Sequence, residues 1–403
     1  MKSKNKCAAL QEHNDKCRKK RTVPWVKTQS TQLGEIVCTN GAPTRCSSGR
    51  PAVSPRDTGV HRGLTSTIHP VVLRDVMRLQ ALETMARLRV VRVVDIALAC
   101  APERPFKAAL SAAQRAMKGL VDARYAGRHV TDRSQHIYGL TEAGARYLYE
   151  RGIQATPSIK RVTAMVNPEH QLWINFLVLS CRARGLPSMT EKELLQHINE
   201  GVRKSSDVRQ GLTSVGESKS RRWLRPDAVA FEPDGITWFE VDRSTRGSAR
   251  LEHLMSLVKK IGTDLVTLKE NIRGTSYLGN RLTRVVVFSR YDAIHHRNLA
   301  RMRKMVAKAN EQVLTPGNTR HFFEIEEGLF TVMACVNIDD NLPPADQVVG
   351  HVIFQMLPTW LPKFRQTKEQ LPEGLGWFNE NYLPYRRPGS MVKWPIPVCP
   401  LLR

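Results

Sequence analysis

Two carboxylates in one short stretch of the chain could meet and do chemistry. The stretch at 227–242 reads DAVAFEPDGITWFEVD. Its first five residues alternate with alanine, Pro-Asp-Gly supplies a turn, and the residues after the turn are rich in aromatic and β-branched types. This pattern predicts a β-hairpin. The turn sets Phe231 opposite Ile236, and the same register sets Asp227 opposite Glu240, with Cβ atoms about 5 Å apart. Carboxylates at that distance repel each other unless a cation or a proton lies between them, and Mg²⁺ is held by one or two carboxylates with waters and phosphate oxygens. The spacing therefore predicts nuclease-like chemistry, with Mg²⁺ as the cofactor if the site is active.

The same residues resemble a nuclease signature. Pro226-Asp227 followed by Glu240-Val241-Asp242 is similar to the motif of the PD-(D/E)xK nuclease superfamily. The resemblance implies that Asp227 and Glu240 bind the metal. Asp242 stands where the superfamily has a lysine that steadies the attacking water, and an acidic side chain cannot supply that positive charge. We therefore expect a nuclease-like site whose chemistry is lost or altered.

Several polar residues around this hairpin have both a catalytic and a structural interpretation. Asp242 faces Arg225 in the predicted register, so a cross-strand ion pair is its structural alternative. Glu191 is the candidate third acid, but residues 188–193 contain two overlapping helix-capping patterns, which make it a capping residue instead. His170, at the start of a predicted helix, either approaches the carboxylates or stays in solvent. The candidates for the missing cation are Arg243, Arg246 and Lys259.

The charge balance points to a polyanionic partner. The chain has 62 Lys and Arg against 37 Asp and Glu, a net charge of +25, which most often indicates nucleic acid. The longest apolar run, Leu172–Cys181, is about half of what spans a bilayer. The first residues lack the apolar core of a secretory signal, so we expect a cytoplasmic protein without a membrane partner. The eight cysteines are expected as reduced thiols in that compartment. Cys7, Cys17, Cys38 and Cys46 cluster as a zinc site would, but their spacings match none of the CxxC pairs of structural zinc, which favours scattered thiols.

The first half of the chain divides into an arm and a small domain. Residues 1–70 are basic and lack periodicity, which predicts an arm that either follows phosphates or is a poorly ordered extension. Residues 71–152 predict three helices, a hairpin with strands at 120–125 and 137–140, and a closing helix that Thr141 caps. This order of elements resembles a winged helix-turn-helix domain.

That resemblance implies that the third helix enters a major groove and that the hairpin tip contacts phosphate. The apolar stripe of this helix leaves a basic and polar face outward. Lysines on that face suit phosphates, whereas Gln and Arg have the geometry to contact base edges. Protein contact or dimerisation is the alternative use of such a domain. The candidate DNA-binding residues are Lys107, Ser111, Gln114, Arg115 and Lys118 on the helix and Arg128 and Arg133 at the tip.

Residues 165–340 predict a second domain of α/β type. Helix, hairpin, helix, strand, helix and further strands follow one another, an arrangement that agrees with a restriction-endonuclease-like fold. The polar span 199–220 is expected to be a loop beside the hairpin. Residues 341–403, which include Trp360, Trp377 and Trp394, are expected to form a tail that docks elsewhere or wraps over the core.

Four short motifs in one order resemble a single family. They are YGLTEAG at 138–144, EHQLW at 169–173, RPDAVAF at 225–231 and FEVDRSTR at 239–246. Over about residues 72–290 the chain is similar to the plasmid replication-relaxation family, whose members carry Glu-Val-Asp-Arg rather than Glu-x-Lys. The resemblance implies a DNA-binding accessory factor in the replication or mobilisation of a plasmid or integrative element, and it accounts for the missing lysine.

Three functional hypotheses follow from the sequence. The first is a DNA-binding accessory protein of a mobile element, acting in replication, mobilisation or transposition, with a degenerate nuclease-like domain. The second is an active Mg²⁺-dependent DNA endonuclease, for example the strand-cutting subunit of a transposition system. The third is a transcriptional regulator whose α/β domain binds a partner. Double-stranded DNA is the expected partner in all three, with other proteins of the mobile-element complex and a second copy of the chain as further candidates.

Overall fold

The computed structural model of the 403-residue chain describes residues 68–104, 106–131, 134–165, 168–216, 222–242, 248–265, 281–289, 292–337, 343–356 and 385. Several predictions concern residues outside these ranges. They are the arm up to residue 67 with its four cysteines, the wing-tip Arg133, the candidate cations Arg243 and Arg246, and the three tryptophans of the tail.

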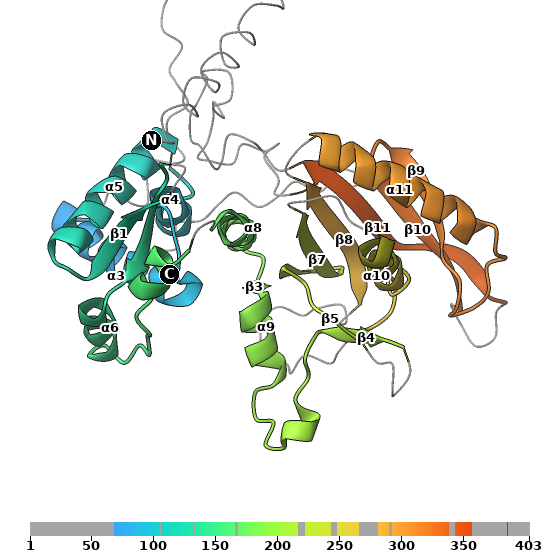
Figure 1. Cartoon of the computed structure of the whole chain (residues 1–403), viewed down its shortest axis with the longest axis horizontal. Coiled ribbons are helices and arrows are strands. Elements are labelled where there is room, and N and C mark those ends of the chain that lie inside the picture. Colours follow the sequence, from blue (N-terminus) through green and yellow to red (C-terminus); the bar gives the residue numbers. More distant parts are fainter. Residues whose placement is uncertain are drawn as a thin grey trace, which may run out of the picture. The chain divides into compact units, whose positions relative to one another are not determined.

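The N-terminal domain contains the elements that the sequence predicts, in the predicted order. Helices α3 (Pro70–Leu88), α4 (Val93–Cys100) and α5 (Phe106–Asp122) are followed by a hairpin of β1 (Ala126–Val130) and β2 (His136–Leu140) and then by α6 (Glu142–Tyr149). All of them except β2 are labelled in Figure 1. A backbone bridge from Val91 to Tyr138 joins the start of α4 to the hairpin.

The predicted hairpin strand at 120–125 is wrong. Helix α5 continues to Asp122, because Leu120 still belongs to the buried stripe of that helix. The helix ends where Arg124 adopts a left-handed conformation, with φ of 61°, and the strand starts at Ala126. Thr141 caps α6 as predicted, since its side chain accepts a hydrogen bond from the Gly144 backbone N–H at 3.1 Å.

The motif YGLTEAG contains two glycines that close packing requires. A Cβ on Gly139 would lie 3.2 Å from the backbone of Ile159 in α7 (Ile159–Thr163) and closer still to Val162. A Cβ on Gly144 would lie 2.2 Å from the carbonyl oxygen of Tyr125. The motif therefore encodes the junction between the hairpin and the helices on either side of it.

A seven-stranded mixed sheet forms the core of the C-terminal part. Its strand order is β3-β6-β7-β8-β11-β10-β9; β7 pairs parallel with β8 and β8 with β11, and the other neighbours are antiparallel. The strands are β3 (Ser188–Thr190), β6 (Ala228–Glu232), β7 (Gly235–Asp242), β8 (Leu282–Ser289), β9 (His321–Glu326), β10 (Leu329–Val336) and β11 (Ala345–Met356). The fold class is thus mixed α and β, as the sequence indicates.

Helices cover both faces of this sheet. Helix α8 (Glu169–Ala183) packs on the face that carries Ala228, Ala230 and Phe239, whereas α10 (Ser248–Val258) and α11 (Asp292–Asn310) cover the opposite face, with Val229 and Trp238. Figure 1 shows α10 and α11 crossing the strands on one side of the sheet. Helix α9 (Glu191–Ile198) follows β3 directly.

The sheet extends beyond the boundary expected at residue 340. Strand β11, in the segment predicted to be a tail, lies inside the sheet between β8 and β10. Its buried residues Val352, Ile353 and Phe354 are the signal that sequence reasoning overlooked. Beyond it, Tyr385 is fully buried against Phe239, with ring centroids 5.3 Å apart, so part of the predicted tail joins the core.

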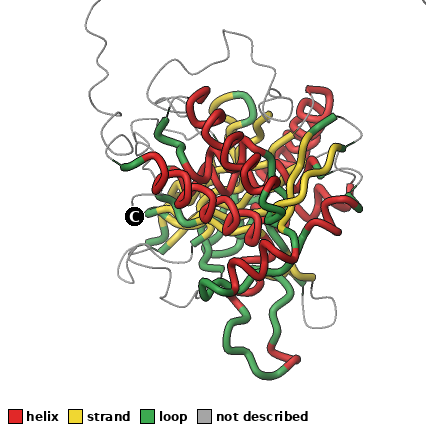
Figure 2. Tube along the Cα trace, turned by 90° about the vertical axis from the view of Figure 1, so that its left-hand side faces the viewer, coloured by secondary structure: helices red, strands yellow, loops and turns green. Residues whose placement is uncertain are grey.

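The described part of the predicted polar loop, residues 199–216, is largely a loop. After α9 the loop contains one turn of 3-10 helix, Ser205–Asp207. The chain then forms β4 (Thr213–Val215), which pairs with β5 (Arg222–Leu224). Figure 2 shows this long connection as loop with a short helical piece.

Three cysteines are described, Cys100, Cys181 and Cys335, and all carry free, buried thiols, in agreement with the expected reduced state. No described helix combines the length and the apolar character needed to cross a membrane.

Candidate functional site

The β6–β7 hairpin has the predicted register. Phe231 pairs with Ile236, and the ladder continues to Ala228 opposite Phe239. The Asp227 backbone N–H donates to the Phe239 carbonyl at 3.1 Å, which extends this pairing by one residue beyond the ladder. Because side chains alternate along a strand, Asp227 and Glu240 belong to the face that also carries Trp238 and is covered by α10 and α11.

The Asp227 carboxylate is held by the backbone of the neighbouring strand. Its Oδ2 accepts a hydrogen bond from the Val241 N–H at 2.7 Å, and the Nε2 of His170 lies 3.3 Å from the same oxygen. Both side chains are partly exposed, Asp227 at 23% and His170 at 35%. The start of α8 therefore brings His170 to the carboxylate site, the first of its two sequence-based interpretations.

The other two carboxylates of the motif also have protein donors. The indole N–H of Trp238 donates to Oε1 of Glu240 at 2.8 Å. Asp242 is buried and accepts a hydrogen bond from the side-chain amide of Asn298, in α11, at 3.2 Å. Asn298 is itself fully buried. At position 242, where the motif of the resemblance would have a lysine, this chain has an acid that accepts a hydrogen bond from a neutral amide.

The predicted ion pair between Asp242 and Arg225 does not form. The Arg225 guanidinium instead lies 3.6 Å from the Glu191 carboxylate and donates to the carbonyl of Gln210. Arg225 precedes β6 and lies outside the β6–β7 ladder, so the strand register does not fix where its long side chain points. Lys259, the described candidate for the missing cation, is exposed at the end of α10.

Glu191 is next to the hairpin without joining its carboxylates. Its backbone N–H donates to the Asp227 carbonyl at 3.2 Å, while its side chain pairs with Arg225. The capping box at this helix is formed by Thr190 and Glu193, which exchange hydrogen bonds with each other's backbone N–H groups. Glu193 also pairs with Arg87 of α3. Partial burial acts to raise the pKa of Glu193, but Arg87 and the Thr190 N–H outweigh it, and the pKa is lowered.

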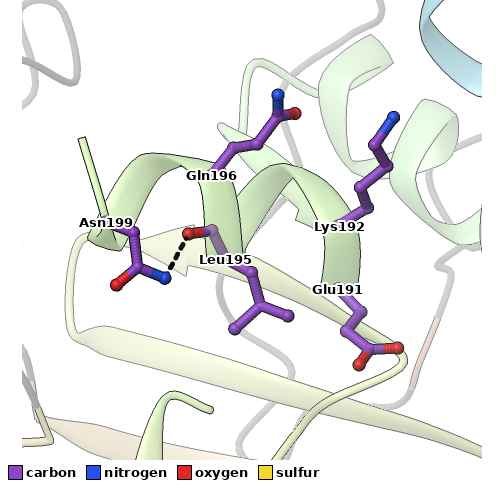
Figure 3. A pocket seen from close by; sticks show the side chains of 5 residues that line it. All are labelled: Glu191, Lys192, Leu195, Gln196 and Asn199. Carbon is purple, nitrogen blue, oxygen red and sulfur yellow. Dashed lines mark hydrogen bonds between the residues drawn. The ribbon is translucent and has the colours of Figure 1, made fainter. Parts of the chain in front are cut away.

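A shallow pocket opens on α9 beside Glu191. Figure 3 shows its lining, in which the side-chain amide of Asn199 donates to the Leu195 carbonyl at 2.9 Å. The polar groups of the pocket belong to one helix face and do not converge on one point. The lining residues are Glu191, Lys192, Leu195, Gln196 and Asn199.

The residues of the carboxylate site do not fit a nuclease metal centre. Among the residues that the structure describes, no group of three or more His, Cys, Asp or Glu side chains could hold a metal ion. Asp227 and Glu240 each direct one oxygen at an N–H donor of the protein, and Glu191 is paired with Arg225. A site for Mg²⁺ needs carboxylate oxygens turned toward a common point, with waters filling the other positions.

The outward face of α5 is as the sequence predicts. Ala109, Ala113, Ala116, Met117 and Leu120 are buried against the rest of the domain. The five candidate side chains of α5 are all exposed, namely Lys107, Ser111, Gln114, Arg115 and Lys118. Four of them recur at steps of four, three and four residues, so they form one stripe along the helix. Arg128, on β1, is exposed as well.

Sequence reasoning missed a buried polar network at the turn of the hairpin. Glu232 is fully buried and accepts hydrogen bonds from the hydroxyls of Thr237 and Tyr385. The guanidinium of Arg284 lies 3.5 Å from Glu232 and pairs with Asp234. The sequence feature that could have indicated this network is Arg284, which begins the otherwise largely apolar strand segment RVVVFS.

The fold and the sites define the class of this protein. It is a mixed α and β protein with a helical N-terminal domain, whose third helix exposes basic and polar residues, and a C-terminal mixed sheet with a carboxylate-bearing hairpin.

A family model described as replication-relaxation matches residues 82–263, from the middle of α3 past the end of α10, so this part of the chain is similar to the replication-relaxation family. This similarity suggests a role in the replication or mobilisation of a plasmid or another mobile element. The comparison with curated proteins gave no match, and the comparison with solved structures gave none either.

Proposed function

We propose that this protein is a DNA-binding accessory factor of a plasmid or other mobile element, in which the N-terminal domain is a winged helix that reads DNA and the C-terminal domain is a degenerate restriction-endonuclease-like domain. The observation that carries the proposal is the exposed stripe of α5. It places two lysines at its ends and Ser111 and Gln114 between them, on the face opposite the buried alanines.

The chemistry of the stripe suits a major groove. Lys107 and Lys118 are far enough apart to contact phosphates on both sides of the groove, which positions the helix. Gln114 and Arg115 lie between them; the Gln114 amide can donate and accept at base edges, and the Arg115 guanidinium can donate there. Arg128 on the hairpin supplies a further cation for the backbone beside the groove. The net charge of +25 supports the same ligand.

The order of elements supports the nuclease-like assignment of the second domain. Helix α8 precedes the antiparallel strands β3, β6 and β7, and α10 then leads to β8, which is parallel to β7. The side-chain contacts of Asp227, Glu240 and Asp242 support a structural role for the motif. We propose that this domain holds the DNA-binding domain in place and meets other proteins of the mobile-element complex or a second copy of the chain.

DNA binding by the full chain tests this proposal. We would measure the anisotropy of a labelled duplex over a range of salt concentrations for the wild type and for Lys107→Gln with Lys118→Gln. Each lost phosphate contact should reduce the slope of log K against log salt by about 1, and Gln114→Ala should reduce discrimination between duplexes. Arg146→Gln with Arg151→Gln, which removes one exposed cation from α6 and one just after it, is the matched control. Binding by the α5 variant that equals that of the control variant would refute the proposal.

An active Mg²⁺-dependent endonuclease is the second candidate, favoured by Asp227 and Glu240 on one face with His170 beside them. Nicking of supercoiled plasmid in Mg²⁺ or Mn²⁺ tests it, with Asp227→Ala and Glu240→Ala as the variants. Metal-dependent nicking that both changes abolish would establish the endonuclease and refute a degenerate site.

A transcriptional regulator, the third hypothesis, would instead protect a promoter in a footprinting experiment.

A further inference from the structure

Helix α11 carries a row of cations on its solvent side. Arg297, Arg301, Lys304 and Lys308 are all exposed, and they follow one another at steps of four, three and four residues. At 3.6 residues per turn these steps keep the four side chains on one stripe, and the 1.5 Å rise per residue makes that stripe about 16 Å long. The buried residues Asn298, Leu299, Met302 and Val306 lie on the other side of the helix.

The row is not needed to fix the helix on the sheet. A fifth cation, Arg303, joins the helix to the sheet, because its guanidinium binds the carboxylate of Glu324 in β9 at 2.6 and 2.7 Å. By contrast, Arg297, Lys304 and Lys308 make no side-chain hydrogen bond or ion pair in the described part of the chain. Three of the four cations of the row thus have no structural use within the fold.

The composition of α11 differs from that of an ordinary solvated helix. A solubilising face mixes both signs of charge, often with acids four residues before the cations. Helix α11 has five Lys and Arg and a single acid, Asp292, in its first turn. Like charges at a spacing of four residues repel each other, and a row that accepts this cost within one helix is suited to a ligand of opposite charge.

The length and spacing of the row suit the backbone of a DNA duplex. Duplex DNA carries one negative charge per 1.7 Å or so of its axis, so 16 Å of duplex presents about ten phosphates, five on the strand nearer the helix. Cations one helical turn apart can contact such a strand without base readout, since phosphate contacts position a protein and carry no sequence information.

We propose that α11 is a second DNA-binding surface, which contacts the phosphate backbone of double-stranded DNA independently of sequence. The proposal rests on the DNA-binding function argued above for the nature of its ligand. Asn298, the neighbour of Arg297, donates to Asp242 at the end of β7, so the first turns of α11 adjoin the carboxylate hairpin. The row lies beyond residues 82–263, the part that matches the family.

Neutralising the row in the full chain tests the proposal. The variant combines Arg297→Gln, Lys304→Gln and Lys308→Gln. A matched variant keeps the charges through Arg297→Lys, Lys304→Arg and Lys308→Arg. Because all three side chains are exposed, both variants should fold; the matched variant should unfold at the temperature of the wild type, and the neutral variant at that temperature or slightly above it, since it loses the repulsion. The slope of log K against log salt should fall by between 2 and 3 in the neutral variant, about 0.9 per phosphate contact, and stay unchanged in the matched variant.

The outcomes separate this proposal from the function on which it rests. A neutral variant that binds as the wild type does, while the α5 variant binds weakly, overturns the second surface and leaves the proposed function intact. Loss of binding in the neutral variant with no loss in the α5 variant supports the second surface and overturns the reading of DNA by α5. A charge-preserving variant that binds as weakly as the neutral one overturns the phosphate contact, and a wild type that binds no duplex overturns both proposals.

Discussion

Replacing Asp227 distinguishes a structural carboxylate from a metal ligand. Its Oδ2 accepts the Val241 N–H at 2.7 Å, a charge-assisted hydrogen bond that joins the end of β7 to the residue before β6. Hydrogen bonds to charged groups contribute about 1.5–3 kcal/mol. Asp227→Ala removes the acceptor and should lower the free energy of unfolding by that amount. Asp227→Asn keeps a neutral oxygen at the same place and should cost about half as much.

Urea unfolding of the full chain measures this difference, first in EDTA and then with Mg²⁺. A ligand that binds only the folded state raises its stability by RT ln(1 + [L]/Kd). If the carboxylate is structural, the order of the three proteins, wild type, Asn and Ala, stays the same with and without Mg²⁺. The reasoning is refuted if Mg²⁺ stabilises the wild type and this stabilisation is absent from both variants, since that pattern requires the carboxylate to bind the ion.

Three further predictions concern the two domains. Gly144→Ala should destabilise the N-terminal domain by about 1–3 kcal/mol in thermal unfolding, because the new methyl group meets the Tyr125 carbonyl at 2.2 Å; a variant as stable as the wild type would contradict this packing. Burial and nearby Arg284 lower the pKa of His351 from 6.5 to about 4, so stability should fall as pH drops from about 6.5 to 4, and His351→Gln should flatten that profile in urea titrations. Tyr385→Phe removes the hydroxyl that donates to buried Glu232 and should cost about 1–3 kcal/mol by thermal unfolding, whereas an unchanged midpoint would argue against this contact.

The parts of the fold that local patterns determine could be predicted from the sequence. A period of two and a Pro-Asp-Gly turn set the register of β6 with β7, and the structure has that register. A period of 3.6 separates the buried from the exposed face of α5, which the structure also has. Thr141 and the pair of Thr190 with Glu193 cap their helices because capping depends on residues three apart.

The parts that depend on residues distant in sequence could not be predicted. Strand β11 reads as one more apolar segment, and only its pairing with β8 and β10 makes it internal to the sheet. Asn298 meets Asp242 across 56 positions of the chain, and Tyr385 meets Glu232 across 153. The ion pair expected for Arg225 failed for a related reason. Register fixes which residues face each other within a ladder, but a long side chain at its edge can reach another partner.

The acid at position 242 has a consequence for how charge is distributed in the described part of this protein. A lysine beside Asp227 and Glu240 would offset their charge locally, whereas position 242 here holds a buried acid that accepts a hydrogen bond from the Asn298 amide. The positive charge lies on the surface instead, in the stripe of α5 and the row of α11. Changes in α5 and α11 should therefore alter DNA affinity with little effect on stability, and changes at Asp227 should alter stability with little effect on affinity. A protein in which both kinds of change altered both properties equally would have its DNA site at the hairpin itself.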